Sequence, residues 1–590
     1  MAQKDVMRTS LSGILLFSVL LYSFQITQLT PGGYRVDIYS ELGYKLIAEF
    51  ITIFALSQIL FTTAKRPYRW LSLGVLLGVW MSFVLSPYLM GYYVSDRGDS
   101  LQSVGYIRTI LTTSHTDPRD IYPTQWIFLG SVQRIVGLSV QDIVVLASVL
   151  NNGMFILALL LFVRRFGSEI IAYFVPAFLL TFYHGTIIAE FFAYSLLTIL
   201  VYFLIVVHRS QSNKDFRWSV VITVFLVTLV FSHPFVAFFC LGMLGFLVLS
   251  STIEAKGSGF YSRLFGLYAI VLLGWLAWQR ILTRTLFLVP VFLRKMVIIK
   301  QVSYATSTSG VGIVELLKYF LIRFWGQLVL YSVVMLMGFY LVLSLKRWKV
   351  HGGYNRSLGE GFLSLWSIIF TGILLLQKHG YDRVLGLNFM IIGAVIVLSM
   401  IWNLVGLSWT EPVRIMLVFI LPFSVFSVFY SPINGMAYTG ITYGELSGIV
   451  FSFSHLTSGL RVIDPLGEAG RWSAWLFGYS ETFKRQEVLY SYRLPDHFGY
   501  PSVDCFSKNK YIQKIAHNLF GYQKLRVYPY PKLVVVIPDY PIQLYEEAPL
   551  FKRVRRFTHL DEQRLRADYS VNLIYHGSSL RVYRPIPCTG

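Results

Sequence analysis

The chain repeatedly carries uninterrupted apolar runs of about 18 or more residues, each long enough to cross a hydrocarbon core of roughly 30 Å as a helix. Hydrophobic residues make up 55% of the 590 residues and charged residues only 14%, whereas a soluble domain carries roughly 25% charged residues. The sequence therefore predicts an α-helical polytopic membrane protein. We expect about thirteen spans, at residues 9–29, 44–63, 70–92, 141–163, 169–185, 186–207, 218–232, 235–250, 264–282, 316–344, 359–377, 388–407 and 413–431.

Basic residues indicate how these spans are oriented. Lys and Arg cluster in five loops between spans, at residues 65–69, 164–165, 209–217, 256–263 and 346–356. All five lie on one side of the membrane if the N-terminus is cytoplasmic, as the positive-inside rule requires. The net charge of +21 is thus explained by membrane topology, and we expect no nucleic-acid partner. The first run follows Lys4 and Arg8 but lacks a convincing cleavage site, so we expect a retained span.

The tail changes character after the last expected span. Residues 454–590 alternate polar and apolar side chains and contain many tyrosines. The run 532–537 predicts a buried strand, and 572–583 predicts a β-hairpin whose turn contains Gly577. We therefore expect a multi-span domain at 1–453 and a small extracytoplasmic α/β domain at 454–590. Cys505 and Cys588 pair only if this domain faces an oxidising compartment, a point that the sequence leaves open.

A short acidic loop, Ser95-Asp96-Arg97-Gly98-Asp99, directly follows the third expected span. A carboxylate at a bilayer boundary is costly unless it faces water or a site, which makes Asp96 and Asp99 candidate functional residues. Apolar residues then recur at helical spacing, so the outer loop 93–140 should contain an amphipathic helix on the membrane surface. The alternative for Asp99 is a structural one, since an aspartate at that place also caps a helix.

Other polar residues lie near expected span ends. Lys378 and Arg383, with Asp382 between them, suit a phosphate group on the outer side, and Arg294 invites the same interpretation; a snorkelling cluster at a helix end is the alternative. His233 occupies a tight turn between spans and is a binding candidate or a structural residue. Glu190 lies about one turn inside a span, where lining of a cavity is plausible.

Local motifs around the acidic loop resemble the GT-C superfamily of membrane glycosyltransferases, which use polyprenyl-phosphate sugar donors, and in particular its large archaeal-type members. The similar segments are Gly98-Asp99-Ser100-Leu101 with Gly105-Tyr106, Ile121 to Trp126, Asn434 to Tyr438, Glu445 to Gly448, and the tail from Leu573 to Arg584. The resemblance implies that Asp99, with Asp96 second, is the catalytic carboxylate. Two features depart from it: two spans precede the span that ends in the acidic loop, and the tail has Trp472-Ser473-Ala474-Trp475 and not the Trp-Trp-Asp motif of oligosaccharyltransferases.

The resulting functional hypothesis is an inverting glycosyltransferase that acts on the extracytoplasmic face. Its partners would be a polyprenyl-phosphate sugar donor, membrane lipid, and a glycan, lipid or protein acceptor. Phosphate-binding loops and nucleotide-binding glycine motifs are absent, which disfavours soluble nucleotide chemistry. Asp117 and Asp120 are turn residues or, with Asp99, ligands of a divalent cation such as Mg or Mn. Two alternatives stay open: a secondary transporter or lipid-linked glycan flippase, and a non-catalytic scaffold for envelope assembly.

Overall fold

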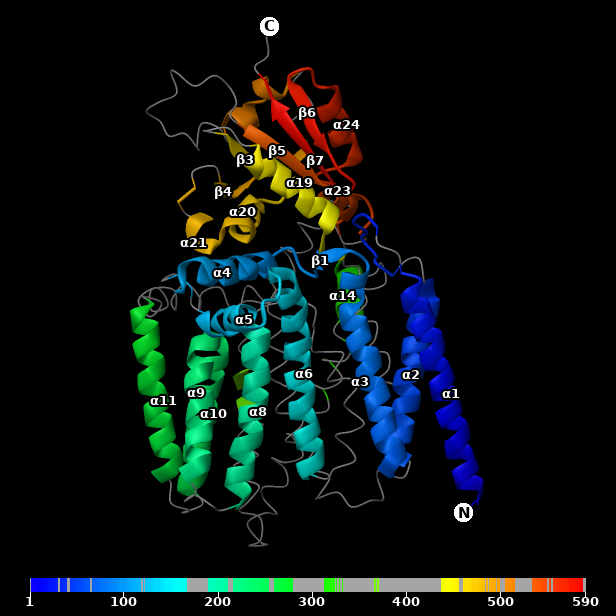
Figure 1. Cartoon of the computed structure of the whole chain (residues 1–590), viewed down its shortest axis with the longest axis vertical. Coiled ribbons are helices and arrows are strands. Elements are labelled where there is room, and N and C mark those ends of the chain that lie inside the picture. The colour runs from blue at the N-terminus through cyan, green and yellow to red at the C-terminus, as the bar shows by residue number, and fades with distance from the viewer. Residues whose placement is uncertain are drawn as a thin grey trace.

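The computed structural model has two layers, a set of long helices side by side and a C-terminal α/β domain at one end of them (Figure 1). It describes residues 2–29, 32–39, 43–63, 66–117, 120, 122–166, 189–210, 216–253, 259–279, 312–323, 437–455, 460–482, 484–485, 488–494, 496–498, 505–514, 533–548, 551–552 and 555–586, together with 325, 328, 332, 366, 367, 369 and 370.

The long helices follow the apolar runs of the sequence. They are α1 (Ala2–Thr27), α2 (Gly43–Thr63), α3 (Arg66–Leu89), α6 (Val140–Phe166), α8 (Ala189–Ser210), α9 (Phe216–Ser232), α10 (Pro234–Ile253) and α11 (Gly259–Trp278), with the shorter α14 (Ile313–Arg323). Among the described residues, five of these helices are long and apolar enough to cross a membrane: α1, α3, α6, α10 and α11. The prediction of a multi-span membrane protein is confirmed to that extent. The spans expected at 169–185, 388–407 and 413–431, and most of those at 316–344 and 359–377, lie outside the described residues.

Two helices lie crosswise between the layers, α4 (Asp99–Thr113) and α5 (Pro123–Val136). The apolar stripe of α4 was expected to face lipid, and the structure corrects this. Leu101, Val104 and Ile107 are buried inside the protein, because α4 packs against α5 on one side and against helices of the C-terminal domain on the other. The stripe is therefore an interdomain core surface.

The C-terminal domain is built on a five-stranded mixed sheet of order β4-β3-β5-β7-β6. Its elements are β2 (Ile441–Thr442), α19 (Tyr443–Ser454), β3 (Arg461–Asp464), α20 (Ala469–Phe477), α21 (Tyr479–Thr482), β4 (Val488–Arg493), a 3-10 turn (Phe506–Lys508), β5 (Leu533–Pro538), α23 (Asp539–Glu546), α24 (His559–Ala567), β6 (Val571–His576) and β7 (Leu580–Pro585). Every residue of β5 is buried, as an apolar run in a central strand requires. The expected strand and hairpin are both present, and the hairpin pairs antiparallel.

The start of the C-terminal domain also contacts the layer of long helices. Helix α19, which was expected to belong with the spans, packs on β5 and β7, and Thr442 caps it by accepting a hydrogen bond from the Glu445 N–H at 3.1 Å. Strand β1 (Tyr92–Val94), at the end of α3, pairs antiparallel with β2, Tyr92 opposite Thr442 and Val94 opposite Ile441. Backbone hydrogen bonds therefore join a span end to the C-terminal domain.

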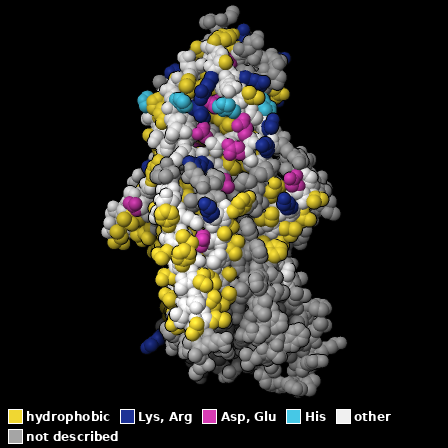
Figure 2. Space-filling model, turned by 90° about the vertical axis from the view of Figure 1, so that its right-hand side faces the viewer, with side chains coloured by type: hydrophobic (Ala, Val, Ile, Leu, Met, Phe, Trp, Pro, Cys, Tyr) yellow, Lys and Arg dark blue, Asp and Glu magenta, His cyan; other side chains and the backbone are white. Residues whose placement is uncertain are grey.

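The two layers differ in surface chemistry. On the face shown in Figure 2, most described charged and histidine side chains gather over the C-terminal domain, and hydrophobic side chains dominate the described helices below it. Within the domain, Cys505 is disulfide-bonded, whereas Cys240 in α10 is free and buried. Cys588, the partner that the sequence suggests, lies outside the described residues.

Candidate functional site

The acidic loop, residues 95–99, lies at the junction of the two layers. It begins where β1 ends and runs into the first turn of α4, so β1–β2 pairing fixes one end and α4 the other. The Asp99 side chain is 65% exposed, whereas Asp96 is half-buried. The N-cap of α4 is Gly98, and Asp99 is the acidic residue of its first turn; Asp96 Oδ2 lies 3.5 Å from the Ser100 N–H. Asp99 thus also has the place of a residue that stabilises the helix dipole, and the structural alternative stays open beside the catalytic one.

The two carboxylates have different electrostatic surroundings. Burial raises the pKa of Asp96 above its usual value, and the nearby charge of Asp99 raises it further. Arg471, from α20, acts in the opposite direction, and its Nη2 lies 3.5 Å from Asp99 Oδ1. A Cβ added to Gly98 would lie 3.3 Å from both Arg471 Nη1 and Asp96 Oδ2, which shows how closely this guanidinium covers the loop. The site thus presents one exposed and one half-buried carboxylate beside a partly exposed cation.

Arg97, between the two aspartates, points into the protein. Its Nη1 lies 2.8 Å from Glu445 Oε1 and 3.2 Å from Glu468 Oε2, and its Nη2 lies 3.0 Å from Glu445 Oε2. Nη2 also donates to the Gly440 carbonyl at 3.1 Å, and the guanidinium lies 3.9 Å from the centre of the Tyr540 ring. Burial alone would lower the pKa of Arg97, but the two glutamates raise it above its usual value. Arg97 is a buried, charged group whose two ionic partners, Glu445 and Glu468, are also buried, and only its Nε lacks a hydrogen-bond partner among the described residues.

Glu468 and Arg471, whose side chains contact residues of the acidic loop, lie one helical turn apart at the start of α20. Asp464, at the end of β3, accepts backbone hydrogen bonds from Leu466, Gly467, Glu468 and Ala469 at 2.7–3.0 Å. This carboxylate fixes the turn that leads into α20, because it satisfies donors that a helix start would otherwise leave unpaired. Glu468 and Arg471 are then oriented toward Arg97 and Asp99 respectively.

A second acidic pair lies between α4 and α5. Asp117 accepts a hydrogen bond from the Ser480 hydroxyl of α21, and Asp120 Oδ1 accepts from the Tyr122 N–H at 2.9 Å. Both carboxyls are buried. Burial, with a further contribution from Asp117, raises the pKa of Asp120 to about 7. These contacts favour the turn-residue interpretation over ligation of a cation together with Asp99.

His233 lies close to this second pair. It occupies the turn between α9 and α10, as expected, and is buried. Its ring stacks on Tyr122 with the centroids 4.9 Å apart and an interplanar angle of 11°. His233 therefore packs against the segment that joins α4 to α5, and the described contacts do not bring it to the acidic loop.

The remaining predicted site residues are not located by the structure. Lys378, Asp382, Arg383 and Arg294 lie outside the described residues. Glu190 is the second residue of α8, but its side chain is outside the described part. The expected meeting of Asp99 with Lys378 and Arg383 thus stays a prediction. Within the described residues, no three His, Cys, Asp or Glu side chains are grouped so as to hold a metal ion.

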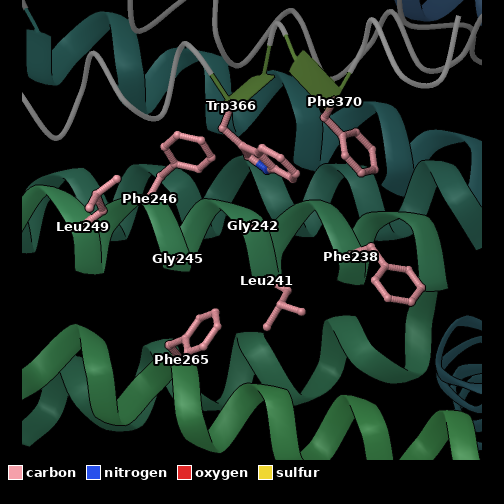
Figure 3. Close-up of a pocket in the computed structure, with 9 residues that line it drawn as sticks. All are labelled: Phe238, Leu241, Gly242, Gly245, Phe246, Leu249, Phe265, Trp366 and Phe370. Carbon is pink, nitrogen blue, oxygen red and sulfur yellow. The ribbon is translucent and has the colours of Figure 1, made fainter. Parts of the chain in front are cut away.

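An apolar groove runs along α10 at the depth of the spans. It has a volume of about 570 Å³ and is lined by Phe238, Leu241, Gly242, Gly245, Phe246, Leu249, Phe265, Trp366 and Phe370 (Figure 3). Trp366 lies over Gly242, where an added Cβ would come within 2.1 Å of its ring, and donates a hydrogen bond from Nε1 to the Phe239 carbonyl at 2.7 Å. The glycine permits this close approach.

Sequence reasoning identified Asp96 and Asp99 but missed Arg97, Glu468, Arg471 and Asp464. The local signals were weak: a basic residue between two acids, and a Glu-x-x-Arg spacing at the start of a helix. Glu445 was noted only as part of a degenerate segment. Nothing in the sequence shows that these groups, separated by 348 residues for Arg97 and Glu445, meet in one network.

The chain shows structural likeness to solved structures of the archaeal oligosaccharyltransferase AglB from Archaeoglobus fulgidus. With the complex that contains an inhibitory peptide and a dolichol-phosphate, the TM-score is 0.46 at 12% identity, over 88% of this chain and 72% of that one. With the zinc and sulfate complex, the TM-score is 0.46 at 12% identity, over 80% and 69%. With the apo form, it is 0.45 at 11% identity, over 93% and 76%. No protein-family model matches the sequence, and no curated protein matches it.

Proposed function

We propose that this protein is a membrane glycosyltransferase of the GT-C type, which transfers a sugar from a polyprenyl-phosphate donor to an acceptor hydroxyl with inversion. The observation that carries the proposal is the acidic loop. It places an exposed carboxylate at the boundary between apolar helices and a polar domain, and surrounding contacts hold it there. That boundary is where a lipid-borne donor and a water-borne acceptor can meet.

In the proposed reaction, Asp99 is the general base and Asp96 the second carboxylate. Asp99 takes the proton of the acceptor hydroxyl as its oxygen attacks the anomeric carbon. The new C–O bond forms while the bond from that carbon to the donor phosphate oxygen breaks, and the lipid phosphate leaves with the electron pair. Half-buried Asp96, with its raised pKa, can then accept or relay the proton.

The donor is expected to bind laterally from the bilayer. The groove on α10 is apolar and adjoins two candidate spans, so we place the hydrocarbon chain of the donor there. Lys378, Arg383 and Arg294 would bind its phosphate, and Asp382, His233 and Glu190 would line the site. An Arg guanidinium can donate two parallel hydrogen bonds to phosphate oxygens, and a Lys ammonium attracts the phosphate as a point charge.

The proposed orientation has a cytoplasmic N-terminus and an extracytoplasmic C-terminal domain at the cell membrane. Helix α1 begins at the end of the helical layer that lies away from the C-terminal domain (Figure 1), which agrees with the basic-loop pattern. A divalent cation fits the described residues poorly, because Asp96 and Asp99 supply only two carboxylates and Arg471 competes for one of them. No step here depends on a metal.

The test is sugar transfer from a radiolabelled polyprenyl-phosphate donor by the full-length chain in proteoliposomes. Asp99→Asn should lose about 10²–10⁴-fold in rate and keep its thermal unfolding midpoint. Glu481→Gln is the matched control, since Glu481 is an exposed carboxylate on α21 with its own cationic partner, Lys484, at 2.6 Å. Equal transfer by Asp99→Asn and the unsubstituted protein would exclude this mechanism, and counterflow of the labelled lipid without transfer would favour a flippase.

A further inference from the structure

The C-terminal domain reaches the acidic loop through side chains of alternating charge. Along the loop, Arg97 and Asp99 carry opposite charges, and at the start of α20, Glu468 and Arg471 carry the complementary ones. Glu468 Oε2 lies 3.2 Å from Arg97 Nη1, and Arg471 Nη2 lies 3.5 Å from Asp99 Oδ1. The two surfaces therefore match in register over one helical turn.

The two pairs differ in burial. Arg97, Glu445 and Glu468 are all less than one-tenth exposed, so breaking this network would leave a charge unpaired in the interior. The Arg471 and Asp99 side chains are 42% and 65% exposed, so solvent screens their attraction and the pair can separate easily. The buried network around Arg97 fixes the loop, whereas the exposed pair of Arg471 and Asp99 can separate when a substrate binds.

The backbone of the loop is held in the same way. The Arg97 N–H donates to the Thr439 carbonyl at 2.7 Å, and Arg97 Nη2 donates to the Gly440 carbonyl at 3.1 Å. The backbone and the side chain of Arg97 are thus both hydrogen-bonded to the segment that precedes β2. Since Asp96 precedes Arg97 and Asp99 follows it by two residues, movement of Arg97 would displace both carboxylates.

We propose that Arg97 is a positioning residue, which the C-terminal domain holds through Glu445 and Glu468 so that Asp96 and Asp99 keep a reactive geometry. The inference rests on the proposed function for its catalytic meaning, but the fixation of the loop is a separate property. The C-terminal domain would then form part of the active site and not an accessory to it. A displacement of about 1 Å at a reacting group can cost 10²-fold in rate.

The experiment combines amide hydrogen exchange over residues 95–100 with transfer kinetics, on the full-length protein in nanodiscs. In Arg97→Gln, exchange at these amides should rise at least tenfold and kcat should fall about 10–100-fold, with the donor KM within twofold. Arg108→Gln is the matched control. Arg108 also joins α4 to α20, through the Leu476 carbonyl at 3.2 Å and the Trp475 ring at 5.3 Å, but it lies two turns from the acidic loop, so exchange there should not change.

If Arg97→Gln does not fold, Glu468→Gln replaces it, because that variant keeps the two-point pair with Glu445. It should raise exchange over residues 95–100 and lower kcat, each by a smaller factor. Unchanged exchange and unchanged kcat in the folded variant, with Asp99→Asn inactive, would overturn the positioning role and leave the proposed function intact. Raised exchange with a fully active Asp99→Asn would overturn the proposed function, and with it the catalytic meaning of Arg97.

Discussion

The contact between α4 and α20 can be tested with a single side chain. Gly105, in the middle of α4, faces the backbone of α20: an added Cβ would lie 2.6 Å from the Ala474 carbonyl oxygen, 2.8 Å from its carbon and 3.1 Å from its Cβ. Ordinary contacts of a Cβ begin near 3.4 Å. A valine at this place would therefore push the two helices apart, because the two nearest atoms in its way belong to backbone, which cannot rotate aside.

Gly105→Val should destabilise the protein by about 1–3 kcal/mol, since over-packing typically costs about 1–3 kcal/mol and the better helix propensity of valine returns less than about 0.5 kcal/mol. For a cooperative unit of 150–250 residues, this lowers the unfolding midpoint by roughly 2–12 °C. Because α20 begins just after Glu468 and contains Arg471, sugar transfer should fall as well.

The assay is thermal unfolding of the purified protein in detergent, followed by tryptophan fluorescence, together with sugar transfer at a temperature where the variant is folded. Gly153→Ala in α6 is the control, because an added Cβ there meets nothing within 4 Å. If Gly105→Val unfolds at the same temperature as the unsubstituted protein, α4 and α20 do not pack as described. The account of how the acidic loop is held would then be wrong too.

Three further predictions use other parts of the structure. Asp120 has a folded pKa of about 7, above its unfolded value of about 4, so its contribution to stability is complete below about pH 4 and is lost as pH rises from 4 through 7; Asp120→Asn should flatten the dependence of the unfolding midpoint on pH between about 4 and 7. Cys505 is disulfide-bonded, and peptide mapping without reduction should recover it linked to Cys588; a freely alkylated Cys505 in the native protein would contradict both the bond and the oxidising compartment. Gly242→Ala should lower the unfolding midpoint by displacing Trp366, and Trp366→Ala should remove most of that penalty in the double variant.

Local sequence patterns predicted the elements of this fold better than their contacts. The apolar runs became α1, α3, α6, α10 and α11, and the alternation near the C-terminus became the β6–β7 hairpin, because each pattern is a property of neighbouring residues. The apolar pattern in α4 correctly predicted a helix, but the prediction that its apolar face contacts lipid was wrong. Apolar side chains at helical spacing show that one face avoids water, but not whether lipid or protein covers it.

The candidate site was predictable only in part, for a related reason. Asp96 and Asp99 attract notice because charge is expensive next to a span. Arg97 is equally important to the geometry, but its partners Glu445 and Glu468 come from the other end of the chain, and a buried ion pair leaves no periodic signal in either segment. A single sequence therefore indicates which carboxylates matter and not what holds them.

The distance in sequence between the acidic loop and its partners has a consequence for biosynthesis. Arg97 leaves the ribosome 348 residues before Glu445, an interval of roughly 20–70 s at about 5–20 residues per second. During that time neither Glu445 nor Glu468 has been made to pair with Arg97. Its guanidinium must stay in contact with water, because burying an unpaired charge costs a large free energy. The loop can take its final place only after both glutamates have left the ribosome, so the geometry of Asp96 and Asp99 is completed late in synthesis.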